Sequence, residues 1–281
     1  MSTQRHQSGS RDVLDQFEDP DVGSWQATGD KKRHSDGNDM RMRHGIPPWE
    51  PDNFQYDVVP DLLTHSWDPV NDRAVGGTDG FIKGKPGVGK STLLCYLVAR
   101  LIDNNDETVW WRASSSRSEW LPLAPWTTLW LPEGAGVDAT LAGRDPRDGT
   151  ISLDVDDLEE IVRDVRRYRS PRDLLDKAGQ ARLHVVYPDP RMRGCQAALD
   201  AAAEKSYEVP ADRETLFDES DPDHHWWFGF NLERVENGPH HWSTWICDEI
   251  GDLLPQTARK DAYGTYQKVQ LMQDSWVDFR K

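Results

Sequence analysis

The sequence predicts an α/β fold with a mostly parallel sheet, and three observations support this fold class. Short apolar runs rich in β-branched and aromatic residues are bounded by turn-forming residues, which is typical of buried strands. Stretches with helical periodicity alternate with these runs. A glycine-rich turn stands directly before an apolar helical stretch. Strands that alternate with helices favour a parallel sheet covered by helices.

The first 74 residues differ in composition from the rest of the chain. Residues 1–46 are polar and have almost no apolar clusters, so they cannot bury a core and are predicted to be disordered. Residues 47–74 carry aromatic side chains between prolines and are predicted to form an extended arm. The folded domain is expected to span residues 75–281.

The first half of this domain is predicted to contain three strands and one buried helix. A short strand at residues 80–82 leads into the glycine-rich turn, and the apolar run at residues 91–101 predicts a helix. β-Prone runs bounded by polar residues predict strands at residues 108–111 and 127–131.

Periodicity predicts further helices in the middle of the domain. Apolar residues recur at helical spacing over residues 158–168, which predicts an amphipathic helix. A Ser-Pro pair begins a second, short helix at residues 170–179. A buried strand is predicted at residues 183–187, and an Ala-rich helix at residues 194–206.

The last part of the chain begins with an acidic stretch, residues 208–223, which is predicted to be a linker or insertion. Two aromatic strands are predicted at residues 226–231 and 242–247, joined by an Asn-Gly-Pro turn. A helix at residues 266–279 is predicted to close the chain, with its apolar side chains on one face.

A complete phosphate-binding motif, G-x-x-x-x-G-K-[ST], follows the first predicted strand. Its residues are Gly84, Lys85, Pro86, Gly87, Val88, Gly89, Lys90, Ser91 and Thr92. Glycines let backbone N–H groups turn inward around phosphate oxygens, and the start of a helix adds a favourable dipole. Lys90 is expected to reach the β and γ phosphates, and Ser91 to bind magnesium beside Thr92. The motif predicts binding of ATP with Mg²⁺.

The second half of such a site is an apolar strand that ends in acidic residues. The run WSTWICDE provides one, ending in Asp248 and Glu249. Asp248 is expected to hold the magnesium through water or through Ser91, and Glu249 to orient and polarise the attacking water. The alternative is a surface acidic pair that caps the strand.

Two pairs of histidines allow more than one interpretation. They are His224-His225 and His240-His241, on either side of the predicted aromatic hairpin. They could meet at a metal ion, but no cysteine or carboxylate lies at ligand spacing, which favours exposed histidines at strand ends.

The densest basic run either contacts nucleic-acid phosphates or forms a solvated, salt-bridged face. It consists of Arg163, Arg166, Arg167, Arg169 and Arg172. Interleaved acidic residues at helical spacing favour the salt-bridged face. Arg112 and Arg117 lie just past a predicted strand, where an oligomeric ATPase can present an arginine to a neighbouring subunit's nucleotide.

The composition indicates the salt concentration and the cell compartment in which the protein works. The net charge is −16, with 35 Asp to 14 Glu and 23 Arg to 10 Lys, which is typical of proteins that stay soluble in concentrated salt. Three widely spaced cysteines indicate free thiols in a reducing compartment. No apolar run reaches membrane-spanning length, so we expect a cytoplasmic protein with no membrane partner.

Four segments together resemble haloarchaeal ATPases of the FtsK–HerA superfamily. They are GKPGVGKSTL, SRSEWLPLAPWTTLWLP, LHVVYPDPRMRGC and WSTWICDEIGDLLP. The resemblance covers residues 75–281 and implies a RecA-like P-loop NTPase core. The AAA+ class is the closest alternative, but Lys90 and Asp248 are 158 positions apart, which exceeds its usual spacing.

The resemblance implies a DNA-translocating motor that works as a homo-oligomer or with a companion polypeptide. The family's sensor strand would follow the last predicted helix, so the chain is expected to be a reduced member or to need a companion. Two alternatives remain. One is an ATP-binding regulatory or scaffold protein with little turnover, and the other is a small-molecule kinase. The acidic net charge argues mildly against DNA binding.

Overall fold

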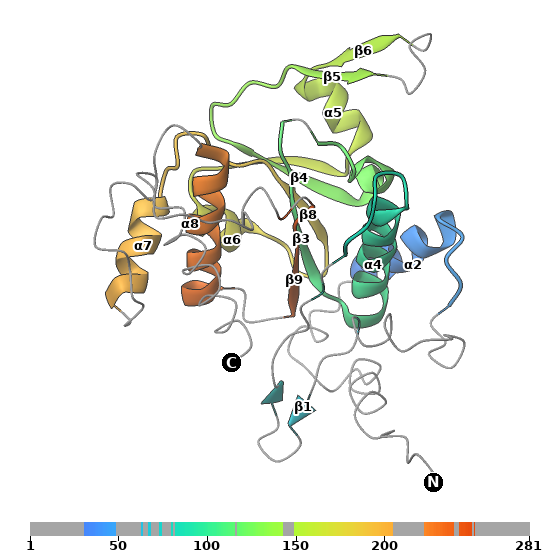
Figure 1. Cartoon of the computed structure of the whole chain (residues 1–281), viewed down its shortest axis with the longest axis horizontal. Helices are drawn as coiled ribbons and strands as arrows, with labels where there is room; N and C mark the ends of the chain where they lie inside the picture. Colours follow the sequence, from blue (N-terminus) through green and yellow to red (C-terminus); the bar gives the residue numbers. More distant parts are fainter. Residues whose placement is uncertain are drawn as a thin grey trace.

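The computed structural model places a five-stranded sheet between two layers of helices (Figure 1). It describes residues 31–48, 63, 67–68, 73–74, 80, 82–115, 117–142, 149–204, 222–238, 242–248 and 250. Helices α2 and α4 lie on one side of the sheet, and α6, α7 and α8 lie on the other. Among the described helices, none combines the length and apolar character needed to cross a membrane.

The central sheet is parallel throughout. Its strands, in spatial order, are β7 (Asp164–Tyr168), β4 (Thr127–Pro132), β8 (Leu183–Val186), β3 (Thr108–Arg112) and β9 (Ser243–Ile246). Every neighbouring pair is parallel. The carboxyl ends of all five strands therefore meet at one edge of the sheet, which is where ligands bind in folds of this type.

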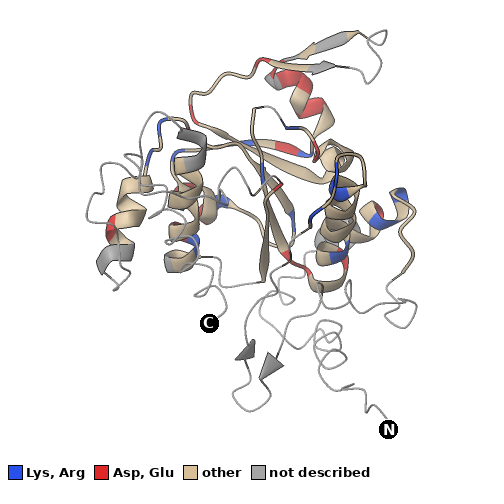
Figure 2. Ribbon diagram, viewed as in Figure 1, with Lys and Arg blue, Asp and Glu red and all other residues tan. Residues whose placement is uncertain are grey.

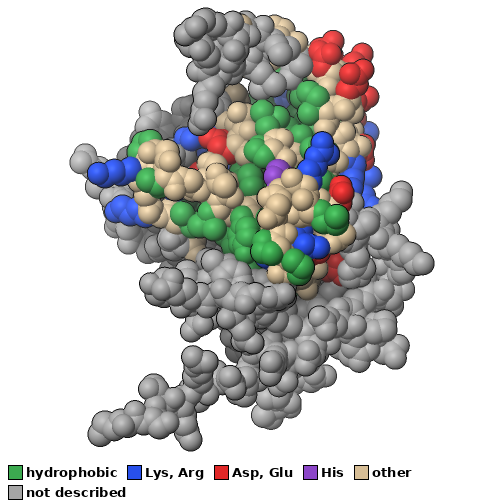
Figure 3. Space-filling view, turned by 90° about the vertical axis from the view of Figure 1, so that its right-hand side faces the viewer, with side chains coloured by type: hydrophobic (Ala, Val, Ile, Leu, Met, Phe, Trp, Pro, Cys, Tyr) green, Lys and Arg blue, Asp and Glu red, His purple; other side chains and the backbone are tan. Residues whose placement is uncertain are grey.

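The first helical layer covers one face of the sheet with α4 (Lys90–Asn105), α2 (Lys31–Arg43) and the 3₁₀ helix η3 (Leu121–Trp126). Val109 and Trp111 of β3 point into this core, as expected for alternate residues of a strand. Seen from this side, apolar side chains gather near the centre of the face (Figure 3).

The second layer covers the opposite face with α6 (Pro171–Lys177), α7 (Cys195–Glu204) and α8 (Pro222–Asn237). Its core is aromatic: Trp110 of β3 packs there against Phe230, whose ring stacks on Trp226 with centroids 5.4 Å apart. Gly229 of α8 lets that helix approach Cys195, because a Cβ at Gly229 would lie 2.6 Å from the Cys195 Sγ.

Smaller elements lie outside these layers. Strands β5 (Ala139–Ala142) and β6 (Thr150–Leu153) form an antiparallel pair, followed by α5 (Val155–Ile161). The acidic residues of α5 stand out as a red band in Figure 2. Strands β1 (Trp67–Asp68) and β2 (Arg73–Ala74) pair with each other.

Most sequence predictions for the centre of the domain are confirmed. The helix predicted at residues 91–101 is α4, and the strands predicted at residues 108–111, 127–131 and 183–187 are β3, β4 and β8. The Ala-rich helix is α7, and the helix predicted from residue 170 is α6, which Ser170 caps by accepting from the Asp173 N–H.

The amphipathic helix predicted at residues 158–168 is wrong in its second half. Asp154 starts α5 with a capping box and the helix ends at Ile161, after which β7 pairs with β4. Val165 packs on the α4 side of the sheet and Tyr168 on the α8 side. A spacing of three residues therefore reaches opposite faces here, as it does in a strand.

The aromatic strand predicted at residues 226–231 is also wrong, since these residues form the centre of α8. Trp226, Trp227 and Phe230 recur at helical spacing and enter the same core. The strand predicted at residues 242–247 is confirmed as β9, so the predicted hairpin is a helix followed by a strand.

Two predictions near the amino-terminal end also need correction. Gly80 and Ile82 belong to no strand, although Ile82 packs against the core beneath α4. Disorder is wrong for residues 31–46, because α2 forms there and buries Met40 to 1% exposure. A single buried methionine and the close approach of Gly37 to α4 accompany the docking of this polar helix.

The remaining predictions fall wholly or mainly outside the described residues. Residues 1–30 and 266–279 lie outside them entirely, and of the acidic stretch at residues 208–223 only the last two, at the start of α8, are described. Within the predicted arm at residues 47–74, the structure describes residues 47–48, the pair β1–β2 and the buried Leu63.

The contact of α2 with α4 provides a first testable prediction. A Cβ on Gly37 would lie 2.5 Å from the Asp103 Cα, and backbone cannot move aside cheaply. Gly37→Ala is therefore expected to displace α2 and to cost ~1–3 kcal/mol, the usual range for overpacking. Hydrogen exchange of residues 37–46 should become faster while exchange within β3 stays unchanged. Unchanged exchange at residues 37–46 would contradict the packing.

Candidate nucleotide site

The loop before α4 has a shape that requires glycine. Gly87 and Gly89 have φ angles of 81° and 90°, in the left-handed region that other residues rarely adopt. At Gly84 a Cβ would lie 2.6 Å from the Val88 Cγ2. The backbone therefore requires glycine at positions 87 and 89, while a side chain at position 84 would have to displace the exposed Val88 side chain.

The first turn of α4 presents backbone N–H groups that are not used within the loop. The first helical hydrogen bond runs from the Leu93 N–H to the Gly89 carbonyl at 2.9 Å. The N–H groups of Lys90, Ser91 and Thr92 have no acceptor among the residues that the structure describes. Such groups at a helix start attract anions, and the dipole of a 16-residue helix adds to the effect.

Lys90 lies across the mouth of this loop. Its Nζ donates to the Gly84 carbonyl at 3.1 Å and approaches the Lys85 carbonyl at 3.4 Å. The loop itself is solvent-accessible, and Val88 at its tip is 63% exposed. An ammonium group, free amides and an open surface meet in one place, which fits a polyphosphate.

The topology brings Asp248 to the same edge of the sheet. Helix α4 leads directly into β3, and β3 pairs with the parallel strand β9, which ends just before Asp248. The start of α4 and the carboxyl ends of both strands therefore lie together. Burial, and then the charge of Asp248, raise the pKa of the Cys95 thiol to about 11. Cys95 lies one turn beyond Ser91 on α4, so this charge acts near the predicted magnesium ligand.

The strand that carries Asp248 is anchored at both ends. At its start, Thr244 donates to the Glu107 carboxylate, which also accepts from the Asn105 Nδ2 at 2.8 Å. At its end, the Arg112 Nη1 donates to the Asp248 carbonyl at 3.1 Å. These contacts fix β9 against β3, on the side where α4 begins.

Most of the predicted site residues lie at the same edge of the sheet. Residues 84–92 form the loop and first helical turn, with Ser91 half-buried and Thr92 exposed. Asp248 is half-buried at the same edge, and Glu249 lies outside the described residues.

The two arginines past β3 lie in different surroundings, and the structure contradicts the sequence interpretation for Arg112. Arg112 is only 5% exposed and is bonded to Asp248 of its own chain, so it is not presented to a neighbouring subunit. The Arg117 Nη1 lies 3.8 Å from the Glu119 Oε1. The main-chain carbonyl of Glu119 accepts a hydrogen bond from the Cys95 thiol. Sequence reasoning missed Cys95 and Glu119 as neighbours of the site, because nothing in their local pattern marks them.

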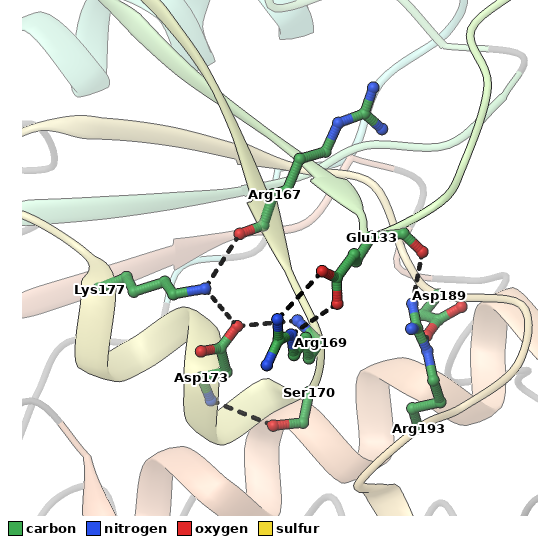
Figure 4. Close-up of polar contacts among 8 residues, drawn as sticks. All are labelled: Glu133, Arg167, Arg169, Ser170, Asp173, Lys177, Asp189 and Arg193. Carbon is green, nitrogen blue, oxygen red and sulfur yellow. Dashed lines mark hydrogen bonds and ion pairs between the residues drawn. The ribbon is translucent and has the colours of Figure 1, made fainter.

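The other end of the carboxyl edge is held by an ion network rather than by free cations (Figure 4). Arg169, after β7, makes two bonds to the Glu133 carboxylate after β4. Arg193 binds the buried Asp189 after β8 and donates to the Glu133 carbonyl. Side-chain bonding to Arg169 lowers the pKa of Glu133. The salt-bridged interpretation of the basic run is confirmed for Arg169, although its scaffold is a strand end and not a helix.

The histidines do not form a metal site in the described part of the chain. His225 is buried within α8, while His240 and His241 lie outside the described residues. No group of three or more His, Cys, Asp or Glu side chains that could hold a metal ion occurs within the described ranges.

Comparisons of the chain with protein-family models, with curated proteins and with solved structures give no match. The functional assignment therefore depends on the loop and on the geometry of the sheet edge.

The environment of Cys95 makes its reactivity a measure of this site. A thiol with a pKa of about 11 is ~1% ionised at pH 9, where an ordinary cysteine is about half ionised. Iodoacetamide is therefore expected to label Cys95 ~50-fold more slowly in the native protein than in urea. Because the folded state holds this proton more tightly, the free energy of unfolding should fall as the pH rises from 9 towards 11. Equal labelling rates in both states, read by mass spectrometry, would show that the thiol is not enclosed.

Proposed function

We propose that this chain binds ATP with Mg²⁺ at residues 84–92 and hydrolyses it. The observation that carries the proposal is the loop itself: two left-handed glycines, three helix-start N–H groups without described acceptors, and Lys90 across the mouth. These groups are the donors that a polyphosphate needs, in an arrangement that the sequence motif alone does not guarantee.

Each residue of the site has one role in this proposal. The backbone of the loop binds the α and β phosphates, and Lys90 leaves the Gly84 carbonyl to bind the β and γ phosphates. Ser91 and Asp248 are the oxygen donors that suit magnesium, one at the start of α4 and one beyond β9. Glu249 orients the attacking water. The bound ion neutralises charge that builds up on the phosphates.

Magnesium fits the residues present. Its preferred ligands are oxygens, and one or two protein oxygens together with phosphates and water usually suffice. Asp248 is half-buried at the edge of the sheet, and its negative charge helps to raise the pKa of the Cys95 thiol. A cation bound there would offset this negative charge.

The resemblance to FtsK–HerA ATPases extends the proposal to work on DNA by an oligomer. The alternative, an ATP-binding regulator, shares the binding site and differs in turnover. Titration with a fluorescent ATP analogue, with phosphate release measured in parallel, tests both. Saturable binding with turnover that DNA stimulates supports a motor, and binding without turnover supports a regulator. The absence of saturable binding would refute the proposed function.

A further inference from the structure

Arg112 is a buried cation at the carboxyl end of β3, where the preceding side chains are apolar. Trp110 and Trp111 are each 1% exposed, and Arg112 itself is 5% exposed. On one side its partner in the sheet register is Val186 of β8. Removing a guanidinium group from water is costly unless its environment compensates, so its position needs a specific reason.

The reason lies across the strand pair, on the β9 side. The ladder between β3 and β9 ends with Trp111 opposite Ile246, two residues before Asp248. Beyond that point the Arg112 Nη1 donates to the Asp248 carbonyl at 3.1 Å. This bond continues the connection between the two strands after their backbone pairing has stopped.

This bond restrains the backbone at Asp248. A carbonyl held by a planar guanidinium restrains the peptide that follows Asp248, and with it the main chain from which the Asp248 side chain extends. Asp248 follows β9 at the edge of the sheet where α4 begins, so the restrained backbone lies beside the loop at residues 84–92. A lysine at position 112 offers a single flexible ammonium and would hold the carbonyl less firmly.

We propose that Arg112 is a positioning residue of the nucleotide site, which holds the main chain of Asp248 so that its carboxylate faces the start of α4. This inference rests on the proposed function, because it assigns Arg112 to the magnesium side of that site. Arg112 acts through Asp248 and does not itself need to touch the nucleotide.

The test compares ATP affinity with and without Mg²⁺ in full-length variants. Arg112→Met keeps the length of the side chain and removes its donors. It is expected to weaken Mg²⁺–ATP binding by ~10-fold or more, the usual cost of losing a residue that orients a metal ligand. ATP binding in EDTA should change less than about twofold, since the loop and Lys90 are intact. Arg112→Lys should restore part of the magnesium effect.

A second measurement needs no nucleotide. Amide exchange of residues 243–250 should become faster in Arg112→Met, because the strand end has lost its anchor. Arg167→Met is the matched control. The Arg167 Nη1 also donates to carbonyls at this edge of the sheet, those of Pro132 and Ala135, but at the end away from Asp248. It should alter neither the magnesium dependence nor the exchange of residues 243–250.

The outcomes separate this inference from the proposed function. If wild type binds Mg²⁺–ATP and Arg112→Met binds it equally well, the inference is wrong and the function stands. If Arg112→Met weakens binding equally with and without Mg²⁺, the residue supports the fold in general and the inference is again wrong. If wild type and Lys90→Ala both fail to bind ATP, the proposed function fails, and the inference fails with it.

Discussion

Replacing Lys90 by alanine is expected to weaken ATP binding by at least ~100-fold. The substitution removes one hydrogen bond to the β phosphate and one to the γ phosphate, and each bond between charged groups contributes ~1.5–3 kcal/mol. The fold should survive, because the bonds of the Lys90 ammonium within the described residues go to carbonyls of its own exposed loop. Glu249→Gln is expected to keep the affinity and lose turnover, because only the water-orienting carboxylate changes. Isothermal titration and phosphate release distinguish the two variants.

Lys85→Ala is the matched control for this experiment. It removes an exposed cation from the same loop, so it should change the affinity only through weak, screened electrostatics. Equal losses in Lys85→Ala and Lys90→Ala would mean that the loop attracts ATP by charge alone. Equal losses of binding in Lys90→Ala and Glu249→Gln would contradict the roles assigned to these residues.

Replacing His184 by leucine is expected to destabilise the protein by ~2–5 kcal/mol, the cost of leaving polar groups without partners inside a core. His184 is fully buried in β8, and its Nδ1 accepts from the Trp130 Nε1 at 3.0 Å. Its Nε2, 2.7 Å from the Gly179 carbonyl, is then the donor. The ring also stacks on Trp110 with centroids 4.8 Å apart. Urea unfolding should show a lower midpoint with an unchanged slope.

His44→Leu provides the control for that substitution. His44 is exposed and touches the Pro122 carbonyl from the end of α2, so its loss should cost less than ~1 kcal/mol. If the two variants unfold at the same urea concentration, the buried hydrogen bonds of His184 to Trp130 and Gly179 do not stabilise the fold.

Local sequence patterns were enough to predict the elements that are buried on both sides. Strands β3, β4 and β8 are buried at every residue and rich in β-branched and aromatic side chains, and α4 combines a long apolar stretch with a glycine-rich start. In such segments the intrinsic preference and the tertiary environment favour the same structure. The conformation of the loop at residues 84–92 was predictable for the same reason, because its own backbone requires glycine at positions 87 and 89.

Elsewhere, partners distant in the sequence decided the structure. The spacing of Val162, Val165 and Tyr168 suits a helix, but β4 offers residues 164–168 an open edge for pairing. The aromatic residues of α8 have high strand propensity, which their helical spacing and the α7 surface override. The bond from Arg112 to Asp248 joins residues 136 positions apart, and no local pattern can reveal it.

That separation has a consequence for the order in which the protein can assemble. The loop and α4 are contiguous in the chain, so they can form early, at little cost in loop closure. The edge that carries Asp248 requires β9 to find β3 across more than 130 residues, a contact of high sequence separation that slows folding. A nascent chain is therefore expected to form the loop at residues 84–92 before β9 brings Asp248 to it. Under the proposed function, Mg²⁺–ATP needs both parts, so it should bind only the fully paired sheet and stabilise the last strand to join it.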